Sequence, residues 1–221
     1  MSDFTSQRTV MVDSQVRPSD VTDRRIPRAM LDVPREVFAP GARKGIAYAD
    51  GHLPLTGDRD ARRVLLAPRT LAKMIQALDV GENDAVLDLG CGTGYSTALL
   101  ARLSRVVTAV EVDPVLAGQA RSALATVGAS TATVNEGLLE VGAPATGPYD
   151  AILLNGAVMD MPAALLDQMK DAGRLVAILI EGGVGRATLW RRFGATFDHR
   201  PLFDAEAPLL PGFARQAAFV L

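Results

Sequence analysis

The sequence is short of the residues on which metal and disulfide chemistry depend. Cys91 is the only cysteine among 221 residues, so no intrachain disulfide and no cysteine-ligated zinc cluster can form. His52 and His199 are the only histidines, which argues against a histidine-rich metal site. We therefore expect no bound metal, and the chain offers almost no histidine to serve as a general base.

An excess of one charge and long apolar runs are also missing. The formal net charge is -2 and the isoelectric point is about 5.7, so no basic field exists to hold nucleic acid. The apolar run at 175–180 is far too short to cross a membrane, and residues 1–4 lack the pattern of a signal peptide. These absences predict a cytoplasmic protein without a nucleic-acid or membrane partner. A hydrophobic content of 48% suffices for one large α/β domain with a small appendage.

What the sequence does contain is a glycine-rich turn behind a buried-strand pattern. An apolar run at 85–89, interrupted by Asp88, precedes glycines at 90, 92 and 94, and an apolar-periodic segment follows at 97–103. Glycine permits a positive φ and lets backbone N–H groups approach a ligand closely. The helix N-terminus behind the turn adds free N–H donors and a partial positive charge. The stretch therefore predicts a site for a small polar ligand with an anionic group.

A second acid strengthens this prediction. Glu111 ends the next strand pattern about 20 residues after the glycines, where an acid can accept both ribose hydroxyls of a nucleoside. The combined pattern resembles the S-adenosylmethionine site of class I methyltransferases, and the alternative is a glycine-rich turn without a ligand. Because ligands of open α/β sheets lie at strand exits, we predict one set of cofactor-binding residues. They are Asp88, Gly90, Cys91, Gly92, Thr93, Gly94, Glu111, Val112, Glu136, Gly137 and Asn155.

These residues have different expected roles. Asp88 should organise the turn and the amino group of the ligand, and Val112 should lie against the adenine face. Glu136 or its neighbours should accept from the adenine exocyclic amine. Cys91 is expected to contribute its backbone rather than a nucleophilic thiol, since no histidine partner can be placed beside it. Asp113 is better explained as the N-cap of a helix that begins at Pro114.

The apolar periodicity predicts a doubly wound, mostly parallel sheet. Strands are expected at 85–89, 106–110, 131–135, 151–154 and 174–180. Beyond 182–185 the strand-like runs are 188–193, 196–203 and 213–221, with no helix between them, which predicts antiparallel strands at one edge. One helix should begin at Pro68 and end at a cap on Gly81, and a second should span 162–170. Residues 1–67 should form a small helical extension with helices at 11–17, stopped before Pro18, and near 29–31, then a long loop at 40–67 with a short strand near 53–55.

Several segments resemble those of one family, the protein-L-isoaspartate O-methyltransferases. The segment 29–40, with Val-Pro-Arg-Glu-Val-Phe at 33–38, resembles its N-terminal signature AM..VPR..FVP. The segments 47–55, 88–95, 148–152 and 168–176 resemble its AY.D.PLPI, EIGTGSGY, PYDAI and QLK.GGRLV motifs. The resemblance implies a Rossmann-like fold with seven strands, S-adenosylmethionine as the methyl donor, and methylation of the α-carboxylate of isoaspartyl residues in damaged proteins. It also implies a cofactor domain at 68–221 and a substrate side at 1–67.

The chain departs from the family in the substrate loop. The family motif GQTISQP carries hydroxyl residues that help to bind the substrate carboxylate, whereas here Val64 and Leu66 occupy the threonine and serine positions. Neither side chain can donate a hydrogen bond. A charge-assisted replacement is expected from nearby arginines, with an exposed basic loop as the alternative. These arginines are Arg59, Arg62, Arg63 and Arg69.

Two other functions remain open at this point. One is a methyltransferase of the same fold with a different acceptor, and the other is a protein that binds the cofactor without catalysis. No catalytic residue is assigned, because a carboxylate acceptor is already ionised at neutral pH and needs no general base. The sequence predicts neither the oligomeric state nor whether the loop at 40–67 closes over the site.

Overall fold

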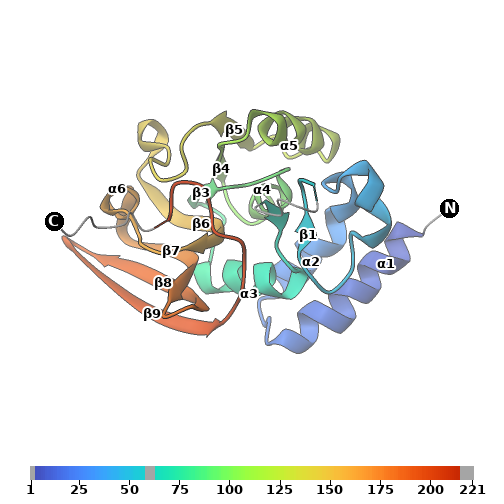
Figure 1. Ribbon diagram of the computed structural model, residues 1–221, viewed down its shortest axis with the longest axis horizontal. Coiled ribbons are helices and arrows are strands. Elements are labelled where there is room, and N and C mark those ends of the chain that lie inside the picture. Colours follow the sequence, from blue (N-terminus) through green and yellow to red (C-terminus); the bar gives the residue numbers. More distant parts are fainter. Residues whose placement is uncertain (1–2, 58–62, 215–221) are drawn as a thin grey trace.

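A seven-stranded sheet forms the centre of the computed structural model, which describes residues 3–57 and 63–214 (Figure 1). The strand order is β5-β4-β3-β6-β7-β8-β9. The strands are β3 (Ala85–Leu89), β4 (Val106–Glu111), β5 (Ala132–Glu136), β6 (Tyr149–Val158), β7 (Met169–Glu181), β8 (Val184–Phe193) and β9 (Thr196–Asp204). The pairs from β5 to β7 are parallel, and β8 and β9 are antiparallel. This confirms the predicted Rossmann-like sheet with its antiparallel edge, and the strand-like run at 213–221 lies outside the described residues from 215 onward.

The two faces of the sheet are covered differently. Side chains alternate between faces along a strand, so Val86 and Leu87 belong to separate apolar clusters. The N-terminal helices pack on the first face with α3 (Pro68–Leu78), α4 (Tyr95–Leu100) and α5 (Pro114–Thr126). The second face is covered by the short helix α6 (Ala163–Leu166), the loop that contains Leu139, and the segment around Leu210. None of the helices within the described ranges is long and apolar enough to cross a membrane.

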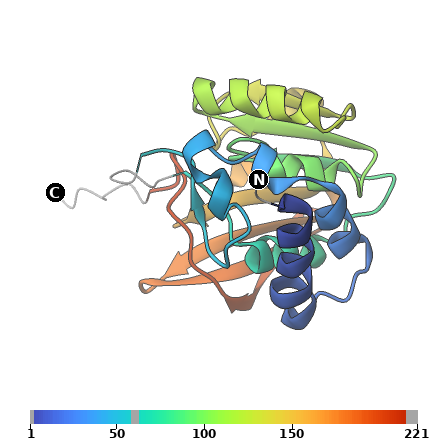
Figure 2. The ribbon, with the colours of Figure 1, turned by 90° about the vertical axis from the view of Figure 1, so that its right-hand side faces the viewer.

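The N-terminal extension is more helical than predicted. Helix α1 (Phe4–Met11) continues through a π-helical turn (Val12–Val16) into a 3-10 turn (Arg17–Ser19), so the helix begins earlier and does not stop before Pro18. Pro18 is accommodated because the last turn is 3-10 rather than α-helical. Helix α2 (Arg25–Asp32) follows, and two 3-10 helices (Arg35–Val37 and Gly41–Ile46) lead into the loop. Figure 2 views the molecule from this end, with the blue helices α1 and α2 in front of the sheet.

The loop before α3 contains a small antiparallel hairpin. Strand β1 (Leu53–Pro54) pairs with β2 (Val64–Leu65), so that Leu53 faces Leu65. The first strand lies where the sequence predicted one, and the second was not predicted. We call residues 53–57 and 63–66 the cover hairpin.

Two predicted helix ends are wrong. Helix α3 ends because Asp79 adopts a left-handed conformation with φ 49°, and the backbone N–H of Gly81 instead donates to the Asp84 carboxylate at 2.9 Å. Helix α6 is much shorter than the predicted 162–170, because Met169 already pairs with Tyr149 as the start of β7.

Candidate functional site

The strand order reverses between β3 and β6, and this places a crevice at their carboxyl ends. Several predicted site residues meet there, although they come from separate strands. Asp88 lies near the end of β3, Asn155 lies within β6, and Glu111 ends β4. Asp88 and Glu111 thus lie at strand exits as predicted, whereas β6 continues to Val158, beyond the end predicted at 154, so Asn155 lies inside the strand.

Asp88 joins three elements around the crevice. Its Oδ2 accepts hydrogen bonds from Ser96 Oγ at 2.8 Å and Thr97 Oγ1 at 2.6 Å, both from the first turns of α4. Its Oδ1 accepts a hydrogen bond from the amide of Asn155. The carboxyl group is completely buried, and this burial raises its pKa to about 6 despite the three donors. Ser96 and Thr97 were missed as site residues, although hydroxyls at a helix start beside a buried acid are a readable signal.

The glycine-rich turn needs its glycines for conformation and for space. The backbone φ values are 68° at Gly90, 58° at Gly92 and 95° at Gly94, and residues other than glycine rarely adopt such values. A Cβ atom on Gly92 would lie 2.5 Å from Leu55 Cδ1, so the cover hairpin rests directly on the turn. Thr93 faces away from the crevice, because its hydroxyl donates to the carbonyl of Phe38 at 2.6 Å.

Glu111 is completely buried, and both of its carboxylate oxygens are engaged by the protein. Oε1 accepts the backbone N–H of Val112 at 3.0 Å and that of Asp113 at 3.2 Å. Oε2 accepts the backbone N–H of Gly92 at 2.7 Å and a hydrogen bond from the Arg63 guanidinium. Glu111, the residue predicted to bind ribose, therefore contacts the glycine turn, and it already has a cation as its partner.

Of the residues predicted to contact adenine, Val112 and Gly137 lie beside Glu111, whereas the Glu136 side chain is engaged elsewhere. Val112 is half-buried beside the crevice, and the N–H of Gly137 donates to the backbone carbonyl of Glu111 at 3.1 Å. The carboxylate of Glu136 instead pairs with Arg121 of α5 at 2.9 Å and is 48% exposed. Asp113 caps α5 as predicted, since its Oδ1 accepts the backbone N–H of Val115 at 2.8 Å.

The four candidate arginines are not equivalent. Arg63 lies in the crevice, where its side chain is 8% exposed. Arg69 is 59% exposed, lies 4.0 Å from the Asp50 carboxylate, and borders a separate cavity of about 940 Å³ with Lys73 and β7 to β9. Arg59 and Arg62 lie outside the described residues.

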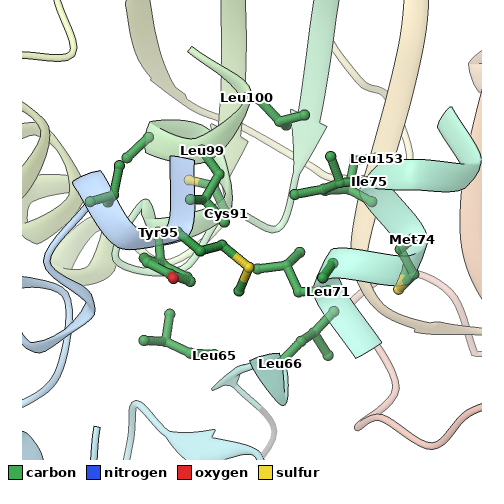
Figure 3. Close-up of a cluster of buried hydrophobic side chains, with 14 of the residues drawn as sticks. Leu65, Leu66, Leu71, Met74, Ile75, Cys91, Tyr95, Leu99, Leu100 and Leu153 are labelled. Carbon is green, nitrogen blue, oxygen red and sulfur yellow. The ribbon is translucent and has the colours of Figure 1, made fainter. Parts of the chain in front are cut away.

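The part of the crevice next to Val64 and Leu66 is apolar and nearly filled. Leu66 is 2% exposed and belongs to the same apolar cluster as Leu65, Leu71 and Tyr95, all of which are labelled in Figure 3. The space that remains between these residues, Val64, Cys91, Ser96 and Asn155 is about 10 Å³. Cys91 contributes a buried thiol whose pKa is raised well above its ordinary value by burial, which agrees with its predicted lack of nucleophilic function.

Buried Arg35 fixes the position of the substrate loop. It lies in the Val-Pro-Arg signature, is completely buried, and donates to the carbonyl oxygens of Ala47 at 2.8 Å and Leu66 at 2.9 Å. Its guanidinium also lies 4.7 Å from the centre of the Tyr95 ring. The signature thus ties the N-terminal extension to the wall of the crevice.

A segment around Leu210 covers the crevice, and no sequence motif predicted this contact. Leu210 is 2% exposed and is held by a hydrogen bond from its N–H to the carbonyl of Ala157 at 2.9 Å. A Cβ atom on Gly156 would lie 2.7 Å from the Leu210 side chain, and one on Gly90 would lie 3.0 Å from it. We call residues 205–213 the closing segment.

His52 links the closing segment to the substrate loop. Its Nδ1 accepts the N–H of Ala67 at 2.9 Å, and its Nε2 lies 2.8 Å from the carbonyl oxygen of Glu206. This pattern requires a neutral ring with the proton on Nε2, and burial lowers the pKa of His52 in agreement. Both nitrogens of the imidazole are therefore used in structural hydrogen bonds, and neither is available to act as a base.

Comparison with known proteins places the chain in one family. A sequence model of the protein-L-isoaspartate(D-aspartate) O-methyltransferase family matches residues 6–191. The protein-L-isoaspartate O-methyltransferase of Roseiflexus castenholzii is 36% identical over 214 residues, which are 96% of this chain and 95% of that protein. The enzyme of the same name from Methylorubrum extorquens is 37% identical over 212 residues, which are 95% and 91% of the two chains.

Solved structures agree in fold. A protein-L-isoaspartate O-methyltransferase superposes with a TM-score of 0.82 at 21% identity, over 94% of this chain and 66% of that one. A Plasmodium falciparum protein, described as a putative protein-L-isoaspartate O-methyltransferase in complex with S-adenosyl-L-homocysteine, has a TM-score of 0.78 at 18% identity, over 92% and 97%. Because a family sequence model and full-length relatives match most of the sequence, this chain belongs to the protein-L-isoaspartate(D-aspartate) O-methyltransferase family.

Proposed function

We propose that this protein is an S-adenosylmethionine-dependent O-methyltransferase that methylates the α-carboxylate of isoaspartyl residues in damaged proteins. The observation that carries the proposal is the family relationship along nearly the whole chain, including 36% identity over 96% of it. The same relationship favours this function over a changed acceptor or a non-catalytic binding protein. Residues 68–221 would hold the cofactor, and residues 1–67 would form the acceptor side. A cytoplasmic location stays a prediction from the sequence.

The donor set at the crevice fits this cofactor. Glu111 ends β4, where ribose hydroxyls need acceptors, and its Oε2 becomes available to them when the bond from Arg63 is released. Asp88 offers buried negative charge for an amino group, and Val112 offers an apolar surface for the adenine ring. Gly90, Gly92 and Gly94 carry no side chains, so a nucleoside can approach the main chain of this turn closely once the covering side chains move. We assign the same site to Cys91, Thr93, Glu136, Gly137 and Asn155 as neighbours in the turn and strand exits.

The bound cofactor supplies a methyl group on a positively charged sulfur. The work left to the protein is to hold an ionised carboxylate in line with that methyl group and to keep water out. The apolar wall formed by Leu65, Leu66 and Leu71 excludes water from the acceptor side. A carboxylate with an ordinary pKa near 4 is already ionised at neutral pH, so no side chain has to remove a proton. The engagement of His52 by two backbone groups agrees with a reaction that needs no base.

The test is methyl incorporation into an isoaspartyl peptide, with the aspartyl peptide of the same sequence as the matched control. We expect methylation of the first peptide and none of the second. Labelling of a different acceptor with neither peptide labelled would favour a changed substrate. Binding of the cofactor without formation of S-adenosylhomocysteine with any acceptor would favour a non-catalytic protein.

A further inference from the structure

Arg63 stands where a ribose bound to Glu111 would lie. Its guanidinium is paired with Oε2 of Glu111, and both side chains are buried, with exposed fractions of 8% and 0%. A Cβ atom on Gly90 would lie 3.1 Å from Arg63 Nη1, so the guanidinium rests on the glycine turn itself. Because Glu111 already uses Oε1 for two backbone N–H groups, Oε2 has to be shared or released before ribose hydroxyls can bind.

The bond between Arg63 and Glu111 leaves the arginine incompletely satisfied. Arg63 Nε is buried and has no hydrogen-bond partner among residues 3–57 and 63–214, which is a cost that a second anionic ligand would remove. Two buried acids, Asp88 and Glu111, border the turn, so a cation here also balances charge. S-adenosylmethionine carries a net positive charge, and its arrival can therefore replace the charge that Arg63 contributes.

The main chain places Arg63 beside the acceptor side of the crevice. Its carbonyl accepts the N–H of Leu55 at 2.9 Å, which extends the pairing of the cover hairpin. Arg63 directly precedes Val64, which occupies the position of a family hydroxyl and borders the apolar space next to Asn155. That space is only about 10 Å³, so the released guanidinium and a carboxylate can meet there only when the surrounding leucine side chains move.

We propose that Arg63 is an exchangeable counter-ion. The ribose hydroxyls of S-adenosylmethionine displace it from Glu111, and the released guanidinium then binds the acceptor carboxylate in place of the missing hydroxyls. This inference rests on the proposed function and assigns it one specificity-determining residue. Arg63 then has two opposite effects, because it weakens binding of the cofactor and strengthens binding of the acceptor.

The experiment measures both effects in the full-length protein. S-adenosylmethionine is titrated calorimetrically into the wild type, Arg63→Gln and Arg69→Gln, and the KM for the isoaspartyl peptide is measured in the same proteins. We expect Arg63→Gln to bind the cofactor about tenfold more tightly, because no pair has to be broken first. Its KM for the peptide should rise about tenfold, because a charge-assisted contact is lost. Arg69→Gln, which removes an exposed arginine outside the crevice, should change neither value.

The outcomes separate this inference from the proposed function. Unchanged or weaker cofactor binding by Arg63→Gln overturns the exchange, and tighter binding with an unchanged KM overturns the acceptor role. Arg63→Lys provides a second variant if Arg63→Gln folds poorly, and it should shift both quantities in the same directions by less, since lysine keeps the charge without the fork of donors. Failure of the wild type and both Arg63 variants to bind the cofactor would instead contradict the proposed function.

Discussion

The strand exits and the two segments that cover them are built from different interactions. At the strand exits, Asp88 and Glu111 are buried polar groups with several hydrogen bonds each. Their partners belong to the sheet, the residues after β4, the glycine turn and α4, and Glu111 also pairs with Arg63 of the cover hairpin. The covering segments contact the same turn mainly through single apolar side chains, Leu55 from the cover hairpin and Leu210 from the closing segment.

This difference divides the site into a part that is preorganised for a ligand and a part whose side chains must move before a ligand can bind. The positions of the strand-exit groups are fixed by the sheet and need no rearrangement to meet a ligand. The covering contacts are apolar except for Arg63, and they fill the space that a ligand requires. Apart from the competition by Arg63, cofactor binding should therefore depend on the strand exits. Acceptor selection should depend on the cover hairpin and the closing segment, which together we call the cover.

The largest expected effect follows from removing the charge of Glu111. Glu111→Gln weakens the acceptors for both ribose hydroxyls, and two charged hydrogen bonds of about 1.5 kcal/mol each correspond to at least a hundredfold loss of S-adenosylmethionine affinity. The variant also leaves Arg63 without its partner, which should lower the free energy of unfolding by about 3 kcal/mol. Calorimetry and chemical denaturation measure the two effects. Glu82→Gln, at an exposed acid between α3 and β3, is the matched control, and an equal loss there would contradict the assignment.

A smaller effect, confined to stability, is expected in the cover. Leu66 is 2% exposed in the apolar wall, so Leu66→Ala should lower the free energy of unfolding by about 3 kcal/mol through lost packing and a new cavity. Cofactor affinity should not fall, because no strand-exit group changes. Val64→Ala, at a half-buried neighbour, should cost less in the same denaturation experiment. Loss of cofactor affinity in Leu66→Ala would show that the two regions are not separable.

The raised pKa of Asp88 predicts that the stability of the protein and its cofactor affinity both depend on pH. Burial raises the pKa of this carboxyl from 3.8 to about 6, so between these values the folded protein holds a proton that the unfolded chain has released. The stability contribution of Asp88 should therefore fall as pH rises from about 4 to about 6, and level off above. Cofactor affinity should change in the opposite direction, rising up to about tenfold per pH unit below pH 6, because ionised Asp88 attracts the amino group.

Denaturation and calorimetry between pH 4 and pH 8 measure these opposite slopes. Asp88→Asn removes the titrating group while keeping an oxygen that Ser96 and Thr97 can donate to. Both slopes should flatten in this variant. Persistence of the affinity slope in Asp88→Asn would mean that a different group near the crevice controls it.

The sequence predicted the strand exits well because their signals are local. A buried strand, a turn that needs positive φ and an acid at the next strand end are each written within a few residues, as in Asp88, Gly90 and Glu111. The parallel sheet then brings these ends together without further information. The helix cap at Asp113 was predictable for the same reason, since its partners are the next two backbone N–H groups along the chain.

The cover was not predictable, because its contacts join segments far apart in the chain. Leu210 reaches Gly90 and Gly156 through a bridge between Ala157 and Leu209, and no local pattern encodes that pairing. The partner of Arg63 follows from tertiary packing, so the sequence named the arginine as a candidate without placing it on Glu111. Glu136 also has a tertiary partner that the sequence did not reveal. Its ion pair with Arg121 competes with the predicted contact to adenine.

The smallest expected effect concerns the family hydroxyl that the cover hairpin lacks. Val64→Thr keeps the side-chain volume nearly constant and restores a donor at a half-buried position beside the acceptor space. One hydroxyl that shares a carboxylate with Arg63 should lower the KM for the isoaspartyl peptide about threefold, toward the weak end of charged hydrogen bonds. Steady-state kinetics with Val112→Thr as the control tests this, because that valine belongs to the cofactor side and its hydroxyl should leave the peptide KM unchanged. An equal decrease in both variants would assign the effect to general polarity, whereas an increase in Val64→Thr alone would mean that the acceptor contacts an apolar wall at this position and that Arg63 binds its carboxylate elsewhere.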